Sequence, residues 1–271
     1  MSTTLLGKSP AGTENGTRRG RPGRGRPGRG RRARGLGRWL GRCAGAVLAL
    51  VVVAALSLGV LVLASPSVGN APQLVNAILA THRAPSDHGQ IPFRLGKALL
   101  ATEDSRFYHD PALDPLGVGR AVLGMATGNG NDGGATIEQQ LAKMLYAPGT
   151  SIDVELEQVG VAFRLDAMYT KVRILAMYLN AAYFGDGAYG CTAAAEHYFG
   201  LPPGRLSWAQ ASLLAGLVQA PSEYDPHGHL ALARSRQRHV LARLVATGVL
   251  TSAQAARIYA EPLGPKVRFY G

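Results

Sequence analysis

Residues 136–145 read TIEQQLAKML and contain the two features of a capped amphipathic helix. Thr136 is followed three positions later by Gln139, the capping-box pattern in which each side chain bonds the other residue's backbone amide. Apolar residues then recur three and four positions apart, which places them on one helix face: Ile137, Leu141, Met144 and Leu145. This stretch therefore predicts a helix with a defined start and one buried side.

The same hydroxyl-to-glutamine spacing occurs at Ser207 and at Thr251, and helical periodicity continues between them. Few stretches show the alternation that is typical of strands. Clusters of proline and glycine separate the helical stretches, at residues 202–204, 221–228 and 262–265. We therefore predict an all-α domain over residues 91–263, followed by a short tail, 264–271.

The charge of the chain is concentrated in its first 42 residues. Of the net charge of +12 over 271 residues, residues 1–42 carry +11, from eleven arginines, one lysine and one glutamate. This segment is rich in Gly, Arg and Pro and cannot bury a core, so we expect it to be disordered. The folded part is nearly neutral, and we expect no nucleic-acid partner. Two cysteines far apart exclude a disulfide framework.

Residues 43–64 form an uncharged apolar run of about 33 Å as a helix, enough to cross a bilayer. The run and the segment before it are too long for a cleaved signal peptide. Because the arginines flank one side only, we expect a single-pass anchor with a cytoplasmic N-terminus. Residues 65–90 would then be a linker and membrane-proximal segment, with the domain on the outer face.

A pair of carboxylates, Glu103 and Asp104, ends a predicted helix over residues 93–102. A carboxylate beside the buried stripe of that helix would be desolvated, which raises its pKa and makes it a better general base. The alternative is an exposed acidic pair at a helix end. Three residues that follow are typical of the rim of a site: Arg106, Phe107 and His109.

The second cluster begins with a loop rich in Gly, Asn and Asp, residues 128–134, which leads into the helix at Thr136. Free amides and the helix dipole at such a start suit an anionic group such as a diphosphate. Gln139 or Gln140 and Lys143 lie three or four apart and can reach one ligand. The alternative is an ordinary capped helix after a turn. Neither a nucleotide P-loop, a metal-ligand spacing nor a nucleophile elbow is visible, and the seven histidines are scattered.

Together, residues from about 91 to 260 resemble the family 51 glycosyltransferases, peptidoglycan polymerases that occur alone or fused to penicillin-binding transpeptidases. The family's first two motifs are close to E-D-x-x-F-x-x-H and G-G-S-T-I-x-Q-Q-L-x-K-N. Residues 171–180 are similar to its K-x-x-I-L-E-x-Y-L-N segment. The chain matches the first two motifs, with His109 one position early, at Glu103, Asp104, Phe107, Gly133, Gly134, Thr136, Ile137, Gln139, Gln140, Leu141 and Lys143.

The chain departs from the family at its third motif, R-K-x-x-E, where the Glu assists near the leaving diphosphate. Gln158 stands in place of that Glu, and the basic pair is absent. Glu157 or Glu155 could substitute, although a shift of one residue turns a side chain by about 100° around a helix. Ala176 replaces a Glu of the fourth motif. We therefore expect reduced activity, and we expect the change Gln158→Glu to raise it.

The resemblance implies a lysozyme-like helical lobe with a smaller jaw lobe near the membrane of a bacterial cell. It also implies that a lipid-linked glycan is extended by lipid II, with inversion and release of lipid diphosphate. Glu103 would be the base, assisted at the third motif by Glu157 or Gln158. The resemblance implies no certain cofactor, but Mg²⁺ or Mn²⁺ could bind at the diphosphate. The candidate substrate-binding residues are Asp104, Arg106, Phe107, His109, Thr136, Gln139, Gln140 and Lys143.

We expect a monofunctional enzyme, because the chain ends at residue 271, and other cell-wall synthesis proteins as partners. The main alternative is a non-catalytic relative that binds lipid II or acts as a scaffold. A lysozyme-like hydrolase is a third interpretation, and it would need a pair of carboxylates across a glycosidic bond.

Overall fold

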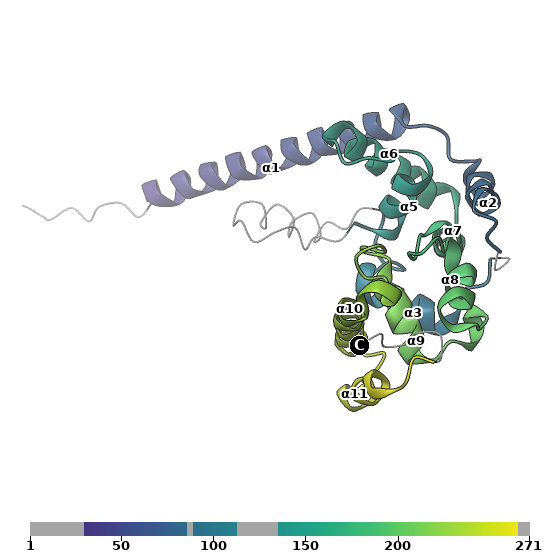
Figure 1. The fold of residues 1–271 in the computed structure, drawn as a ribbon. Coiled ribbons are helices and arrows are strands. Elements are labelled where there is room, and N and C mark those ends of the chain that lie inside the picture. Colours follow the sequence, from purple (N-terminus) through teal and green to yellow (C-terminus); the bar gives the residue numbers. More distant parts are fainter. Residues whose placement is uncertain (1–29, 86–88, 113–134, 265–271) are drawn as a thin grey trace, which may run out of the picture. The chain divides into compact units, whose positions relative to one another are not determined.

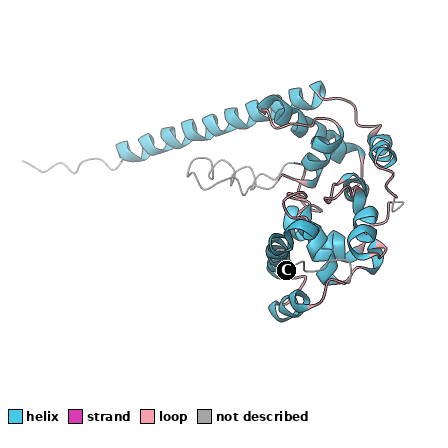
Figure 2. Ribbon diagram, viewed as in Figure 1, coloured by secondary structure: helices cyan, strands magenta, loops and turns pink. Residues whose placement is uncertain are grey.

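The protein is described by a computed structural model over residues 30–85, 89–112 and 135–264 (Figure 1). In these ranges the regular structure is helical, apart from an isolated β-bridge between Tyr183 and Tyr189 (Figure 2). The predicted all-α fold is thus confirmed. The elements are α1 (Gly30–Ala64), α2 (Ala71–Thr81), α3 (Phe93–Glu103), α5 (Ile137–Leu145), α6 (Ile152–Met168), α7 (Lys171–Ala181), α8 (Gly190–Phe199), η1 (Pro203–Arg205), α9 (Trp208–Leu217), α10 (Pro226–Ala246) and α11 (Ser252–Ala260).

Helix α1 contains the predicted membrane anchor. Its segment Arg42–Ala64 has a mean hydropathy of 3.0, and none of its most apolar window is buried. Among the described residues it is the one helix long and apolar enough to cross a membrane. The helix begins at Gly30, before the start of the apolar run at residue 43. After Pro27 no proline interrupts the segment, and Arg, Leu and Ala favour helix. Residues 1–29 lie outside the described ranges.

The three predicted capping boxes are confirmed. At each one the hydroxyl of the capping residue accepts the amide of the third helical residue, a glutamine. The side chain of that glutamine accepts the capping residue's own amide. Such a cap stabilises a helix by about 1 kcal/mol. The caps fix where three helices begin, at Thr136, Ser207 and Thr251.

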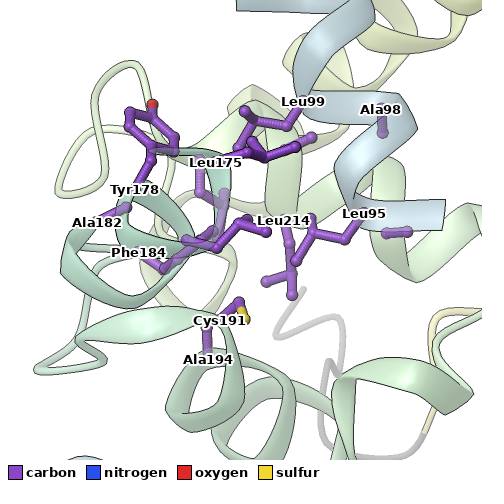
Figure 3. Packing of buried hydrophobic residues seen from close by; sticks show 14 of the residues in the cluster. Leu95, Ala98, Leu99, Leu175, Tyr178, Ala182, Phe184, Cys191, Ala194 and Leu214 are labelled. Atoms are coloured by element: carbon purple, nitrogen blue, oxygen red, sulfur yellow. The ribbon is translucent and has the colours of Figure 1, made fainter. Parts of the chain in front are cut away.

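The core is formed around α7, in which every residue from Ile174 to Ala181 is buried. Contacts between residues group the chain into two units, 1–53 and 54–271, and this core lies in the second. Helix α7 packs on α2, α5 and α8, while α3, α9 and α10 pack on one another. Figure 3 shows side chains from α3, α7, α8 and α9 within the cluster, among them Leu95, Leu99, Leu175, Tyr178, Cys191, Ala194 and Leu214.

The C-terminal end of α1 contacts α6 within the second unit. Arg164 of α6 donates from Nε to the carbonyl of Val62, at 2.7 Å, and from Nη2 to that of Leu63, at 3.3 Å. These carbonyls are among the last four of a helix, which have no partner inside it. A Cβ on Gly160 would lie 2.5 Å from the carbonyl oxygen of Leu61, so glycine permits this close approach.

Candidate active site

The two clusters predicted from the sequence meet at the end of α3. Glu103 is the last residue of that helix, and Asp104 is its C-cap. Oδ2 of Asp104 accepts the backbone amide of Ile137 at 3.2 Å, which ties the end of α3 to the start of α5. Beside it, Nε2 of Gln140 donates to Oε2 of Glu103 at 3.2 Å. The structure therefore places Glu103 against the helix that carries the second motif.

The orientation of Gln140 is fixed by Tyr178, a residue of α7. The Tyr178 hydroxyl donates to Oε1 of Gln140 at 2.8 Å, so Nε2 of the same amide is left to face Glu103. Burial, and then the charge of Glu103, hold the pKa of Tyr178 well above its usual value, so the phenol stays protonated and remains a donor. Sequence reasoning gave Tyr178 no role. The signal that could have identified Tyr178 is a polar hydroxyl group in a helix that is buried on all sides.

The second oxygen of the Glu103 carboxylate faces a cation. Oε1 lies 3.6 Å from Nη2 of Arg236, on α10, and the two side chains are only 13% and 16% exposed. Oε1 is buried and has no hydrogen-bond partner within the described residues. The Glu103 carboxylate is thus held at one oxygen by Gln140 and faces a positive charge at the other. Arg236 was missed because α10 contains several arginines and no pattern distinguishes this one.

The environment makes Glu103 a stronger base than an exposed carboxylate. Burial raises its pKa, while the hydrogen bond from Gln140 and the positive charge of Arg236 lower it, and the net shift is upward. A group buried in this way binds a proton more readily, yet its two partners favour the ionised form. Such a balance is typical of a catalytic general base.

Several residues predicted to bind substrate also make contacts that hold the fold together. Asp104 holds the amide of Ile137, and burial raises the pKa of Asp104 to about 6. Thr136 accepts the amide of Gln139 and donates its hydroxyl to the carbonyl of Ala112 at 2.8 Å. Two amides at the start of α5, those of Ile137 and Gln139, are therefore already bonded. The glycine-rich loop, residues 128–134, lies outside the described ranges.

Lys171 connects the segments around the site. Its Nζ lies 2.7 Å from Glu138 of α5 and 2.8 Å from Asp166 of α6, and it donates to the carbonyl of Asp110 at 3.0 Å. It also lies 5.0 Å from the centre of the Phe107 ring. Burial lowers the pKa of Lys171, but its carboxylate partners outweigh this effect and the net shift is upward. This cation holds the loop after α3 against three helices.

The remaining candidates differ in what they contact. Phe107 belongs to the core, at 2% exposure, and does not reach solvent. Arg106 pairs with Asp110 at 2.7 Å, and both are partly exposed. His109 and Lys143 are exposed, Lys143 in the last turn of α5. Cationic groups are therefore present near the ends of both motifs.

Gln158 has a structural role. Its buried side-chain amide donates to the carbonyls of Ala147 at 2.9 Å and Gly149 at 3.2 Å, which closes the loop between α5 and α6. Glu155 and Glu157 are exposed on α6. A glutamate at position 158 would meet two acceptors, so we expect Gln158→Glu to cost stability, and its effect on the rate stays a prediction.

A divalent cation at the diphosphate stays a prediction, and the third motif offers it one carboxylate fewer than in the family. Mg²⁺ and Mn²⁺ prefer oxygen ligands, carboxylates above all, and Gln158 carries an amide where the family has a carboxylate. In the described part of the chain, side chains close enough to share an ion are Asp186, His197 and His227. These residues are outside the motifs. The sequence reading found no metal-ligand pattern, because the fold joins residues from three separate segments.

Comparison with known proteins places this geometry in a family. Residues 72–245 match the profile described as Transglycosylase, a range that includes Glu103, Gln140, Tyr178 and Arg236. The chain belongs to the transglycosylase family. The resemblance to family 51 glycosyltransferases that the motifs indicated is thereby confirmed at the level of the family.

Relatives with known names support the same assignment. Penicillin-binding protein 1A of Escherichia coli K12 is 38% identical over 174 residues, 64% of this chain and 20% of that protein. The protein of that name from Aquifex aeolicus is 36% identical over 179 residues, 65% of this chain and 25% of that protein. The chain thus spans about a fifth to a quarter of these relatives.

This chain covers most of one further relative and only a small part of another. A Cupriavidus necator protein named as a transglycosylase is 35% identical over 176 residues, 65% of this chain and 76% of that protein. The crystal structure of penicillin-binding protein 1A from Haemophilus influenzae shares 26% identity over 50% of this chain and 17% of its own, with a TM-score of 0.33. That structural likeness is too weak to support the fold.

Proposed function

We propose that this transglycosylase is a membrane-anchored peptidoglycan glycosyltransferase that polymerises lipid II. The proposal rests on Glu103, a buried carboxylate with one oxygen held by Gln140 and the other without a hydrogen bond. The family match supports the reaction class. The polymer would grow while both substrates stay attached to the membrane, which agrees with an apolar helix at Arg42–Ala64.

In the proposed step, the carboxylate of Glu103 takes the proton of the acceptor's 4-hydroxyl group. The hydroxyl oxygen forms a bond to C1 of the donor sugar, and the bond from C1 to the diphosphate breaks, with its electron pair leaving on the lipid diphosphate. The configuration at C1 inverts. General base catalysis of this kind contributes about 10²–10⁴ to a rate. Lys143 and Arg106 are the cations that we propose for the departing diphosphate, and no step uses a metal ion.

Polymerisation of labelled lipid II tests the proposal. The full chain, purified in detergent, is expected to convert fluorescent lipid II into glycan strands that separate by length on a gel. Because the lipid diphosphate of the donor is itself the leaving group, strands should form without added nucleotide. Absence of strands, under conditions in which a control polymerase works, would overturn the enzymatic proposal.

A second candidate function is binding of lipid II without turnover. The structural role of Gln158 favours it, because the third motif then provides no carboxylate at that position. The two functions separate in one experiment: a binding protein retains labelled lipid II in a pull-down but yields no strands. A scaffold for other cell-wall proteins would give the same result in the polymerisation assay.

The proposed orientation places the N-terminus in the cytoplasm and the domain outside the cell membrane. The eleven arginines of residues 1–42 support it, because positive flanks of a membrane helix remain inside. Protease added to intact cells is expected to remove a C-terminal epitope tag. An epitope that resists protease until the cells are broken would contradict this orientation.

The change Arg236→Gln is expected to move the pH dependence of polymerisation. The positive charge of Arg236 favours ionised Glu103, so its loss raises the pKa of Glu103 further. A base works only when deprotonated, and the rising limb of the pH–rate profile should therefore shift to higher pH. The measurement is the initial rate between pH 5 and 9. Arg238→Gln, on the same helix but against Tyr259, is the control; equal profiles for both variants would contradict the role of Arg236.

A further inference from the structure

Three side chains capable of binding a metal ion meet away from the Glu103 site. Asp186 lies in the turn between α7 and α8, His197 in the last turn of α8, and His227 in the first turn of α10. One ligand atom from each lies within 4.8 Å of the other two. Their remaining hydrogen bonds and ring contacts are with Asp225 and Tyr198. None of the three takes part in the proposed transfer step.

The distances are close to those of a coordinated metal. Oδ2 of Asp186 lies 2.8 Å from Nε2 of His197 and 3.2 Å from Nδ1 of His227. Around a tetrahedral Zn²⁺, with bonds of about 2.0–2.1 Å, neighbouring ligand atoms lie about 3.3–3.4 Å apart. The two distances to Asp186 thus differ from those of a coordinated ion by about half an ångström or less, and the two imidazole nitrogens, within 4.8 Å of each other, would approach by at most about 1.5 Å. Because these side chains are 33–48% exposed, the rotations required meet little resistance.

The backbone of a tight turn fixes the position of the Asp186 carboxylate. Asp186 has a φ of 47°, in the left-handed region that residues other than glycine rarely adopt. Its neighbours Gly185 and Gly187 also have positive φ. The turn is closed by the amide of Ala188 on the carbonyl of Gly185, at 2.8 Å, and by the hydroxyl of Tyr183, which accepts the amide of Gly187. The chain therefore holds this carboxylate in a costly conformation that faces two imidazoles.

His197 and His227 are held by their own surroundings. The amide of His227 donates to Oδ1 of Asp225, the N-cap of α10, at 3.0 Å. The rings of His197 and His227 lie 5.3 Å apart, and each has a ring contact with Tyr198. Tyr198 is itself anchored, since its hydroxyl donates to the carbonyl of Phe184. Both imidazoles are thus positioned before any ion arrives, which lowers the entropic cost of binding.

The donor set selects the ion. Two imidazoles and one carboxylate suit Zn²⁺, whereas Mg²⁺ and Ca²⁺ prefer oxygen ligands alone. The exposure of the cluster leaves a fourth position open to water. A plain network of His, Asp and His hydrogen bonds is the competing explanation, and it predicts no affinity for metal.

We propose that Asp186, His197 and His227 bind one Zn²⁺ ion that ties the turn before α8 to the ends of α8 and α10. The ion would cross-link segments that lie up to 41 residues apart in the sequence. An ion bound only by the folded chain stabilises it in proportion to the logarithm of its concentration. Zn²⁺ would therefore raise Tm without taking part in sugar transfer.

Titration calorimetry with ZnCl2 tests this site on the full, tag-free chain in detergent and metal-free buffer. We expect one ion per chain, and a Tm that rises as Zn²⁺ is added. His197→Ala and His227→Ala should each weaken Kd at least tenfold and abolish the rise in Tm. His229→Ala is the matched control, because His229 is an exposed histidine of the same segment, outside the cluster.

Three results would overturn the proposal. The first is a wild-type chain that binds no Zn²⁺. The second is unchanged binding by His197→Ala and His227→Ala, which would locate the ion elsewhere. The third is displacement of Zn²⁺ by equal concentrations of Mg²⁺, which would contradict an imidazole site. Since calorimetry uses no lipid II, these outcomes are independent of the proposed polymerisation.

Discussion

Glu103→Gln is expected to lower the rate of lipid II polymerisation by about 10²–10⁴-fold. The amide has the shape of the carboxylate and can still accept the hydrogen bond from Gln140, but it cannot take a proton from the acceptor hydroxyl. Stability should not fall, because the variant removes a charge that is buried and whose pKa burial raises. Initial rates and Tm, measured on the same preparation, separate the two effects.

Glu223→Gln is the control for this prediction. It makes the same chemical change at an exposed residue outside both motifs, so its rate should equal that of the wild type. If Glu103→Gln kept more than a tenth of the wild-type rate, Glu103 would not be the base. A loss of rate together with a large fall in Tm would instead assign Glu103 a role in the fold.

Gln158→Glu is expected to destabilise the protein by about 2–4 kcal/mol, a fall in Tm of about 5–10 °C. The amide of Gln158 donates to the carbonyls of Ala147 and Gly149, and an ionised carboxylate would place negative charge against both oxygens. Only a protonated Glu could donate to one of them. The pKa of the introduced Glu would therefore be raised above its value in the unfolded chain.

The sign of that shift gives the pH dependence. A carboxyl group whose pKa is raised on folding costs little stability while it is protonated. It destabilises the fold increasingly as pH rises through the raised pKa. The Tm difference between Gln158→Glu and wild type should be larger at pH 8 than at pH 5. Glu157→Gln changes an exposed neighbour and should leave Tm unchanged at both pH values. A faster and equally stable Gln158→Glu variant would show that position 158 still serves catalysis.

Local sequence chemistry predicted much of the fold. The hydroxyl-to-glutamine pairs at Thr136, Ser207 and Thr251 were sufficient to locate three helix starts, because both halves of a capping box lie within one turn. The helix that ends at Glu103 was predicted to within one residue from its buried stripe. Where contacts between residues close in the sequence determine the structure, the sequence alone predicts it.

The parts that were missed depend on tertiary contacts. Tyr178 orients Gln140, and Arg236 faces Glu103, from helices far along the chain, and no spacing in the sequence predicts these contacts. The amides at the start of α5 were expected to be free, but the carboxylate of Asp104 occupies the first of them. Likewise, Gln158 was judged by the motif it breaks, whereas its partners are carbonyls of the preceding loop.

The bonds from Arg164 to the last turn of α1 bear on where the chain can be cut to obtain a soluble fragment. A fragment that starts at Ser65, just after the apolar run, would deprive Arg164 of the carbonyls of Val62 and Leu63. It would also uncover the surface at Gly160 that Leu61 now covers. A start at Ala54, where the second unit begins, keeps these contacts, and detergent or surface substitutions can then deal with the few apolar residues that remain.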